Sequence, residues 1–450
     1  MLRMEILNNL DMIIEKPKYS FCDLQIKPAR TTSIVSRKEC NARYGDMLPL
    51  FTAPMDSVVD DKNYQIYKNS GINVIIHRDV NFEKRLELTK LGEWCAYTLS
   101  EFERVFCNET TEIYDNVETV YALIDLANGH MEKIFTLAKA AKKLAKEKNV
   151  KLVLMSGNIA NPETYRDYCE AGIDYVRCSI GTGSMCLTSA NLSVGMSNAS
   201  LIDEMYNIKQ ELIADVTTHC YENMHSEYFT YTKIVADGGI KNYSDAIVAL
   251  ACGADYVMVG GIFASFLESC ADVVENNGPN DAHLGFLYQH NEEHFVFSIP
   301  RTTDNYKEYN ELVTKYNLSD AKYTNTPLVK TSYDHMLIDL STEQLYIPEV
   351  AKWIVKHTHL KKISHGMSTK EAQIRGMISR GEKVDKSKRK TSEGKTIERD
   401  VQYTVRQWTE NFEDYLRSAM SYTNCRTLED FKGKCELTVK SRGTMMTVNK

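Results

Sequence analysis

A cysteine in a glycine-rich segment is the residue of this chain best suited to covalent chemistry. The segment at 179–188 reads Ser-Ile-Gly-Thr-Gly-Ser-Met-Cys-Leu-Thr, and it follows a strand-like apolar run at 174–178. Glycines let the backbone approach a ligand closely, and a thiol held in such a loop is a nucleophile when its neighbours stabilise the thiolate. A lone cysteine is more often a buried structural thiol. The rest of the chain therefore decides between these two interpretations of Cys186.

The elements that must position this loop form a repeating pattern. Helical periodicity fills several of the gaps between short strand-like runs, including 131–148 and 243–252. The strand-like runs lie at 48–53, 71–76, 93–98, 120–124, 150–155, 175–180, 233–236 and 256–259. Eight strands alternating with helices predict an α/β protein, a parallel (β/α)8 TIM barrel, whose active site lies on the loops after the strands. The Cys186 loop follows the sixth of these strands.

Paired glycines follow the last two predicted strands. They are Gly238 with Gly239, and Gly260 with Gly261. The loops after those two strands form the usual phosphate site of such a barrel, because exposed backbone N–H groups there can bind an anion. Tight turns are the alternative interpretation. Glycine pairs after both strands favour the phosphate site.

Composition limits the classes of protein that fit. The 450 residues, 43% of them hydrophobic, are enough for one large barrel with an accessory segment or for two ordinary domains. A net charge of −7 argues against non-specific nucleic-acid binding, which needs a basic surface. Twelve cysteines without Cys-x-x-Cys spacing and without an apolar leader are typical of a reducing compartment. No apolar run approaches the roughly 20 residues that cross a bilayer. We therefore expect a cytoplasmic protein with no nucleic-acid and no membrane partner.

Further motifs occur in a fixed order along the chain. They lie at 51–58 (Phe-Thr-Ala-Pro-Met-Asp-Ser-Val), 75–78 (Ile-Ile-His-Arg), 125–130 (Asp-Leu-Ala-Asn-Gly-His), 156–158 (Ser-Gly-Asn), 236–240 (Ala-Asp-Gly-Gly-Ile), 260–261 (Gly-Gly), 365–368 (His-Gly-Met-Ser) and 392–396 (Ser-Glu-Gly-Lys-Thr). Together with the Gly-x-Gly-Ser-x-Cys-x-Thr pattern at 181–188, they resemble the IMP dehydrogenase and GMP reductase family. The resemblance covers about residues 20–270 and 363–440 and is closest to the reductases. It favours Cys186 as a catalytic nucleophile.

The resemblance implies a reaction at C2 of a purine nucleotide. The Cys186 thiolate would add to C2 of GMP, and the 2-amino group would leave as ammonia. Thr188 and Glu393 would form the relay that supplies its proton. Hydride from NADPH would then give IMP. The resemblance also implies a homotetramer and a monovalent cation such as K⁺, held by the carbonyls of Gly181, Gly183 and Cys186.

Binding residues follow from the same resemblance. Asp237 would accept the ribose hydroxyls. The expected substrate residues are Ser184, Asp237, Gly238, Gly239, Gly260, Gly261, Gly366, Met367, Ser368 and Lys390. The expected cofactor residues are Arg78, Asp125, Ala127, Asn128 and Gly129.

Two of these expected cofactor residues also fit a purely structural interpretation. Arg78 stands where reductases carry a lysine, and its guanidinium suits the 2′-phosphate of NADPH, but a surface arginine fits equally well. Asp125 can instead cap the following helix. We assign no catalytic role to His77 or His130.

The chain departs from the family in its organisation. Regulated IMP dehydrogenases carry cystathionine-β-synthase (CBS) modules after the second strand, whereas here the run at 71–76 is followed directly by the run at 93–98. An insertion at 276–360 follows the eighth strand instead, with a helix expected at 348–357. The predicted division is therefore a main barrel part at 1–275, the insertion at 276–360, and a flap-like segment with barrel completion at 361–450.

Three functions fit the sequence. GMP reductase is favoured by the motif around Glu393. IMP dehydrogenase would need an Arg-Tyr pair on a mobile flap, and no such pair lies between Gly366 and Glu393. The third is a non-catalytic scaffold that works through the insertion, which an intact set of Cys186, Thr188 and Glu393 disfavours. Gly195-Met196-Ser197-Asn198 replaces the Gly-x-Pro-Gln of reductases, and Lys390 beside Arg389 stands near the usual arginine position.

Overall fold

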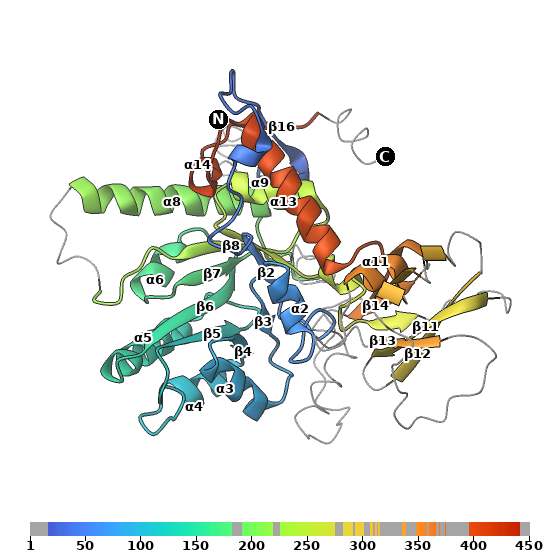
Figure 1. Ribbon diagram of the computed structural model, residues 1–450. Coiled ribbons are helices and arrows are strands. Elements are labelled where there is room, and N and C mark those ends of the chain that lie inside the picture. The colour runs from blue at the N-terminus through green and yellow to red at the C-terminus, as the bar shows by residue number, and fades with distance from the viewer. Residues whose placement is uncertain are drawn as a thin grey trace, which may run out of the picture.

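The core of the protein is a ring of eight parallel strands (Figure 1). The computed structural model describes residues 17–181, 191–218, 226–274, 282–290, 293–300, 307–308, 311–312, 314–315, 335–338, 348–357, 360–365, 369, 374 and 396–441. The ring has the order β2-β9-β8-β7-β6-β5-β4-β3. Its strands are β2 (Leu50–Thr52), β3 (Ile75–Ile76), β4 (Trp94–Tyr97), β5 (Thr119–Asp125), β6 (Lys151–Ile159), β7 (Tyr175–Cys178), β8 (Lys233–Asp237) and β9 (Tyr256–Val259). All eight predicted strands are confirmed.

The ring closes between its first two strands. Phe51 forms a parallel bridge with Asn73, just before β3. The Thr52 amide donates to the Asn73 carbonyl at 2.9 Å, and the Asn73 amide donates to the Leu50 carbonyl at 3.0 Å. These bonds join β2 to the chain entering β3, so the sheet is a nearly closed barrel, and the predicted TIM-barrel fold is confirmed.

Helices cover the outside of the barrel. They are α2 (Tyr64–Asn69), α3 (Phe82–Lys90), α4 (Leu99–Phe106), α5 (Glu132–Glu147), α6 (Thr164–Glu170), α8 (Asn198–Thr218) and α9 (Tyr243–Ala251). α5 buries the stripe that includes Ile134, Leu137 and Ala141, with the spacing of one helix face. α9 begins where the Asn242 side chain accepts from the Asp245 amide.

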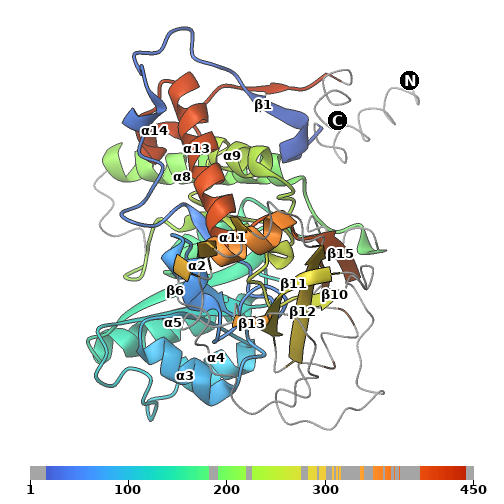
Figure 2. The same cartoon turned by 45° about the vertical axis from the view of Figure 1, so that its right-hand side comes forward.

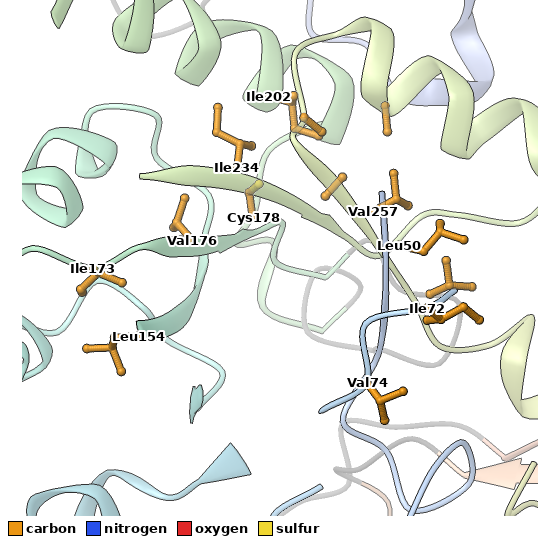
Figure 3. Packing of buried hydrophobic residues seen from close by; sticks show 14 of the residues in the cluster. Leu50, Ile72, Val74, Leu154, Ile173, Val176, Cys178, Ile202, Ile234 and Val257 are labelled. Carbon is orange, nitrogen blue, oxygen red and sulfur yellow. The ribbon is translucent and has the colours of Figure 1, made fainter. Parts of the chain in front are cut away.

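Side chains alternate along each strand between the helices and the barrel interior. Val176 and Cys178 point outward and are fully buried in the layer under the helices, as Figure 3 shows beside Ile234 and Ile202. Residues between them point inward. Four inward aromatic rings, with centroids 5.0 to 6.0 Å apart, fill the barrel: Phe51, Trp94, Tyr175 and Tyr256. Because the interior is packed, a ligand site has to lie at one end of the barrel.

The chain after β9 forms smaller sheets beside the barrel (Figures 1 and 2). β12 (Glu293–Pro300), β11 (Ala282–His290) and β13 (His335–Ile338) form one sheet in that order, and β10 (Asp272–Val274), β14 (Lys361–His365) and β15 (Thr396–Asp400) form another. The predicted helix at 348–357 is α11 (Pro348–His357). An insertion after the eighth barrel strand, β9, thus carries its own sheet and helix, while its boundaries at 275 and 360 remain a prediction.

The C-terminal segment packs back against the barrel. The N-terminal strand β1 (Leu24–Ile26) pairs with β16 (Leu437–Val439). The remaining helices of the described chain are η1 (Phe21–Asp23), η2 (Arg37–Glu39), η3 (Phe263–Ser265), α13 (Val405–Tyr422) and α14 (Leu428–Phe431). Trp408 of α13 stacks on Tyr243 of α9, with ring centroids 4.9 Å apart. Among the described residues, no helix is long and apolar enough to cross a membrane.

Candidate active site

A buried arginine lies at the centre of the charged groups at the carboxyl end of the barrel. Arg177 of β7 points inward, with a side chain only 10% exposed. Its Nη1 donates to Asp125 Oδ1 at 2.7 Å. Its Nε and Nη2 both donate to Asp237 Oδ2, at 3.0 and 2.9 Å. Asp125 and Asp237 are the last residues of β5 and β8. The structure therefore brings two sequence-predicted site residues together on the face where barrel enzymes bind their ligands.

Backbone register explains why these groups meet. Asp125 is paired with Gly157 across β5 and β6, and Gly157 is paired with Arg177 across β6 and β7. A Cβ added to Gly157 would lie 2.4 Å from the Arg177 carbonyl oxygen and 2.7 Å from the Arg177 Cβ. Glycine at this position therefore leaves room for Arg177 to sit against β6. Its guanidinium reaches Asp125 on the far side of that strand.

The charges at this end hold Asp125 in its ionised form. Burial alone would raise the pKa of Asp125, but the guanidinium groups of Arg177 and Arg78 more than offset it, so its pKa lies below the ordinary value. Burial would also lower the pKa of Arg177, yet the two carboxylates keep it raised. The cluster is therefore a set of ion pairs at neutral pH.

Arg78 belongs to the same cluster. Its Nη1 donates to the Asp125 carbonyl at 3.1 Å and lies 3.5 Å from Asp125 Oδ2, and its side chain is 31% exposed. The interpretation of Asp125 as a helix cap is wrong, because Met131 occupies the N-cap position of α5. Arg78 is more than a surface residue, since it neutralises a carboxylate of the candidate site.

Asp237 is held from two sides. Asn158 Nδ2 donates to Asp237 Oδ2 at 2.8 Å and to the Ser179 carbonyl at 3.0 Å. Among described residues, every hydrogen bond to the Asp237 carboxylate goes to Oδ2. Within the described part of the chain, Oδ1 accepts no hydrogen bond, and we therefore assign it to a further donor such as a ribose hydroxyl.

The predicted cofactor segment at 127–129 is fixed to the neighbouring strand. The Gly129 amide donates to the Asn158 carbonyl at 2.8 Å, and the Tyr168 hydroxyl donates to the Gly129 carbonyl at 3.0 Å. A Cβ on Gly129 would lie 2.8 Å from the Asn158 carbonyl oxygen and 2.8 Å from the Tyr168 hydroxyl oxygen. His130 Nε2 accepts from the Ala160 amide at 3.1 Å. This imidazole therefore carries its proton on Nδ1 and links two loops.

His77 is buried beside the same cluster. His77 is only 6% exposed, and this burial lowers the pKa of its imidazole to about 4. It is therefore neutral at physiological pH. Its Nδ1 accepts from the Asp79 amide at 3.2 Å, which fits a structural role.

The glycine pairs lie after neighbouring strands. β8 and β9 pair in parallel, so Gly238 and Gly260 follow the same edge of the barrel. Gly238 and Gly239 have φ values of +99° and +77°, a region that favours glycine. A Cβ on Gly260 would lie 2.9 Å from Met55 Sδ. The buried Asn198 side chain donates to the Gly238 carbonyl at 3.4 Å, so the atypical segment at 195–198 supports this loop.

Comparison with known proteins assigns the family. The family model described as "IMP dehydrogenase / GMP reductase domain" matches residues 18–283. The chain belongs to this family. The GMP reductase of Staphylococcus saprophyticus is 26% identical over 270 residues, which cover 58% of this chain and 74% of that protein. The GMP reductase of Streptococcus suis is 27% identical over 277 residues, with 59% and 76% covered. The Bacillus subtilis GMP reductase is 26% identical over 270 residues, with 58% and 75% covered.

Several predicted family residues fall outside the described part of the chain. They are Gly183, Ser184, Cys186, Thr188, Gly366, Met367, Ser368, Lys390 and Glu393. Their flanking residues are placed. Gly181 follows β7, and the segment from 366 to 395 begins and ends on paired strands. His365 and Thr396 are register partners there, with His365 Nδ1 and Thr396 Oγ1 2.9 Å apart.

The same paired strands border the glycine loops. A cavity of about 560 Å³ is lined by residues of β14 and β15 together with residues after Gly239 and Gly261. They include Lys241, Asn242, Ile262, Lys361 and Arg399. The lining residues of β14 and β15, Lys361 and residues 398–400, lie toward the end of this strand pair opposite to His365 and Thr396.

Sequence reasoning missed Arg177 and Asn158 as site residues. The run at 174–178 was interpreted as apolar, although a charged residue between the outward Val176 and Cys178 has to point into the barrel. This alternation of outward and inward positions was the sequence signal that identifies Arg177 as an inward residue. The sequence signal for Asn158 was weaker. This residue lies in the 156–158 motif, but its contact with Asp237 depends on how the strands pack.

Proposed function

We propose that this chain is a GMP reductase, which converts GMP and NADPH to IMP, ammonia and NADP⁺. Family membership and relatives named GMP reductase support the proposal. The observation that carries it is the meeting of Asp237, expected at the substrate ribose, and Asp125, expected at the cofactor, on Arg177. The segment that carries Cys186 begins directly after β7, which ends at Cys178, one residue after Arg177.

The described residues support a mononucleotide site. Amides of Gly238, Gly239, Gly260 and Gly261 would bind the phosphate at the end of β8 and β9. Asp237 Oδ1 would accept a ribose hydroxyl, since Oδ2 already accepts from Arg177 and Asn158. The remaining proposed contacts, outside the described residues, are those of Ser184, Gly366, Met367, Ser368 and Lys390.

The chemistry proposed for the chain's own residues has two parts. The Cys186 thiolate forms a bond to purine C2, and the bond from C2 to the exocyclic nitrogen breaks as ammonia leaves. Thr188, oriented by Glu393, supplies the proton that makes ammonia a leaving group. NADPH, when bound, supplies hydride. Release of IMP then returns the electron pair of the carbon–sulfur bond to Cys186.

The cofactor end of the site fits a negatively charged dinucleotide. Arg78 is partly exposed at the rim, and a guanidinium has five N–H donors, so it can contact both Asp125 and a phosphate. Asp125, Ala127, Asn128 and Gly129 form the adjoining wall. The cation predicted at Gly181, Gly183 and Cys186, and the homotetramer, stay predictions from the resemblance, and no step above depends on them.

An assay of both family reactions tests the proposal. The purified full chain is incubated with GMP and NADPH, or with IMP and NAD⁺, while the reduced-nicotinamide absorbance is followed and nucleotides are separated by chromatography. We expect IMP from GMP and little XMP from IMP. XMP formation at an equal or higher rate would replace this assignment with IMP dehydrogenase, and no turnover of either pair would favour a scaffold.

Two cysteine variants sharpen the assay. Cys186→Ala should abolish turnover while GMP binding persists, because phosphate and ribose contacts supply most of the ground-state affinity. Cys22→Ala removes an exposed thiol and should leave turnover unchanged. Full activity of Cys186→Ala would contradict the covalent step.

A further inference from the structure

One side chain contacts both halves of the candidate site. Arg177 donates one hydrogen bond to Asp125 and two to Asp237, from β7 to the ends of β5 and β8. The side chains of Asp125 and Asp237 are 12% and 15% exposed. Water therefore screens these contacts weakly, and Arg177 is the cation that the two carboxylates share.

The stability of the fold does not by itself explain the ion pairs of Arg177. A buried ion pair is often no more stabilising than apolar packing of the same volume. Yet a planar guanidinium fixes the direction of what it binds, because its donors lie in one rigid fork. Here that fork occupies Asp237 Oδ2 on one side and Asp125 Oδ1 on the other.

We propose that Arg177 is a positioning residue that couples the substrate and cofactor halves of the site, by presenting Asp237 Oδ1 to the ribose and orienting Asp125 beside Arg78. The inference rests on the proposed function. It adds that the two halves are linked through one side chain, so that a change at the Asp125 end alters GMP binding.

The charged and titratable groups that face Asp125 set the direction of the pH dependence. They are Arg177 from β7, Arg78 and the neutral His77 after β3, and Asp237 beyond the arginine. Both guanidiniums lower the pKa of Asp125. Loss of the Arg177 contact leaves Arg78 alone to hold the ionised form, so the acid limb of the pH profile moves to higher pH.

Arg177→Lys is the primary test variant. A single ammonium keeps the charge, but it cannot bind both carboxylates through a rigid fork. We expect at least about a tenfold loss of GMP affinity, measured by titration calorimetry without cofactor. We also expect the acid limb of kcat/KM to move to higher pH. Arg166→Gln removes an exposed arginine of α6 that pairs with Glu163 and Glu211, and it should change neither quantity.

Asp125→Asn tests the link from its other end. It weakens the Arg177–Asp125 contact and leaves the Arg177–Asp237 pair in place. Asp125 is not expected to contact GMP, so a GMP affinity lowered several-fold without cofactor supports coupling, even if Arg177→Lys does not fold. The combined variant should lose less affinity than the sum of both single losses.

The outcomes separate this inference from the proposed function. A wild-type chain that binds GMP but turns over neither nucleotide pair contradicts the proposed function and leaves the binding test intact. Normal GMP affinity in Asp125→Asn together with an unshifted pH profile in folded Arg177→Lys would overturn the coupling alone.

Discussion

Two buried ion networks lie at opposite ends of the barrel, and they differ in how completely their carboxylates are satisfied. At the amino end, just before β9, Asp255 Oδ1 accepts from Lys432 Nζ at 2.7 Å. Asp255 Oδ2 accepts from Lys209 at 2.9 Å and from the Ile234 amide at 2.8 Å. At the carboxyl end, the described contacts of Asp237 all fall on one oxygen.

We interpret the first network as a contribution to the stability of the fold and the second as part of the proposed ligand site. Lys432 lies just after α14 and Lys209 lies on α8, so Asp255 ties the C-terminal segment and a barrel helix to the base of the barrel. Burial would raise the pKa of Asp255, but the two lysines hold it below the ordinary value. A closed network of this kind stabilises, whereas an oxygen left available can bind.

Lys432→Met should have the largest effect on stability. Removing Lys432 leaves Asp255 Oδ1 without its donor and Lys209 as the remaining cation on the buried carboxylate, which we expect to cost about 3 kcal/mol in free energy of unfolding. Urea denaturation measures this loss, and the GMP affinity of the folded protein should stay within about twofold. Lys434→Met changes an exposed lysine nearby and serves as the control. A loss of stability no greater than that of the control would remove the distinction between the networks.

Asp237→Asn should show the opposite balance. The amide keeps the shape but loses the charge that Arg177 binds, and the hydrogen bonds to a charged group are worth about 1.5–3 kcal/mol. We expect GMP affinity to fall by about tenfold to a hundredfold in calorimetry. Stability should fall less than in Lys432→Met, because Asp125 still neutralises Arg177. Unchanged GMP binding would show that Asp237 is not part of the substrate site.

A buried lysine of the smaller sheet beside the barrel gives a pH prediction. Lys362 of β14 donates to the carbonyls of Leu267 and Ser269 and to the Ser269 hydroxyl, at 2.7, 2.6 and 3.1 Å. Burial lowers the pKa of Lys362 from 10.5 to about 7. The unfolded chain therefore binds more protons between about pH 7 and 10.5, and this lysine makes stability rise with pH across that window.

Lys362→Met removes the titrating group and tests that sign. Denaturation midpoints measured between pH 7 and 10 should rise more steeply with pH in the wild type than in the variant. Lys361→Met, at the exposed neighbouring position, should keep the wild-type slope. Equal slopes in wild type and Lys362→Met would contradict the lowered pKa.

Local patterns predicted the barrel well because each strand carries its own evidence. Val176 and Cys178 alternate with inward residues, and α11 follows from an apolar stripe that begins at Pro348. The partners of Arg177 did not follow, since they lie 52 and 60 residues away and meet only when the ring closes. The parallel pairing of β11 with β13 is likewise non-local. The positions of Cys186, Thr188 and Glu393 stay predictions.

The smallest expected effect concerns the exposed ion pairs of the barrel surface. Arg166 of α6 lies 2.6 Å from Glu211, closer than the 2.7 Å of the shortest pairs in the two buried networks, and 3.1 Å from Glu163, but its side chain is 38% exposed. Water and salt screen such a pair, and ordering two long side chains costs entropy, so pairs of this kind contribute about 0–1 kcal/mol. Arg166→Gln should therefore lower the free energy of urea unfolding by less than about 1 kcal/mol. The difference should shrink further in 0.5 M salt, an added concentration of about three times physiological ionic strength. A loss as large as that of Lys432→Met would mean that distance, rather than burial, decides the strength of these networks.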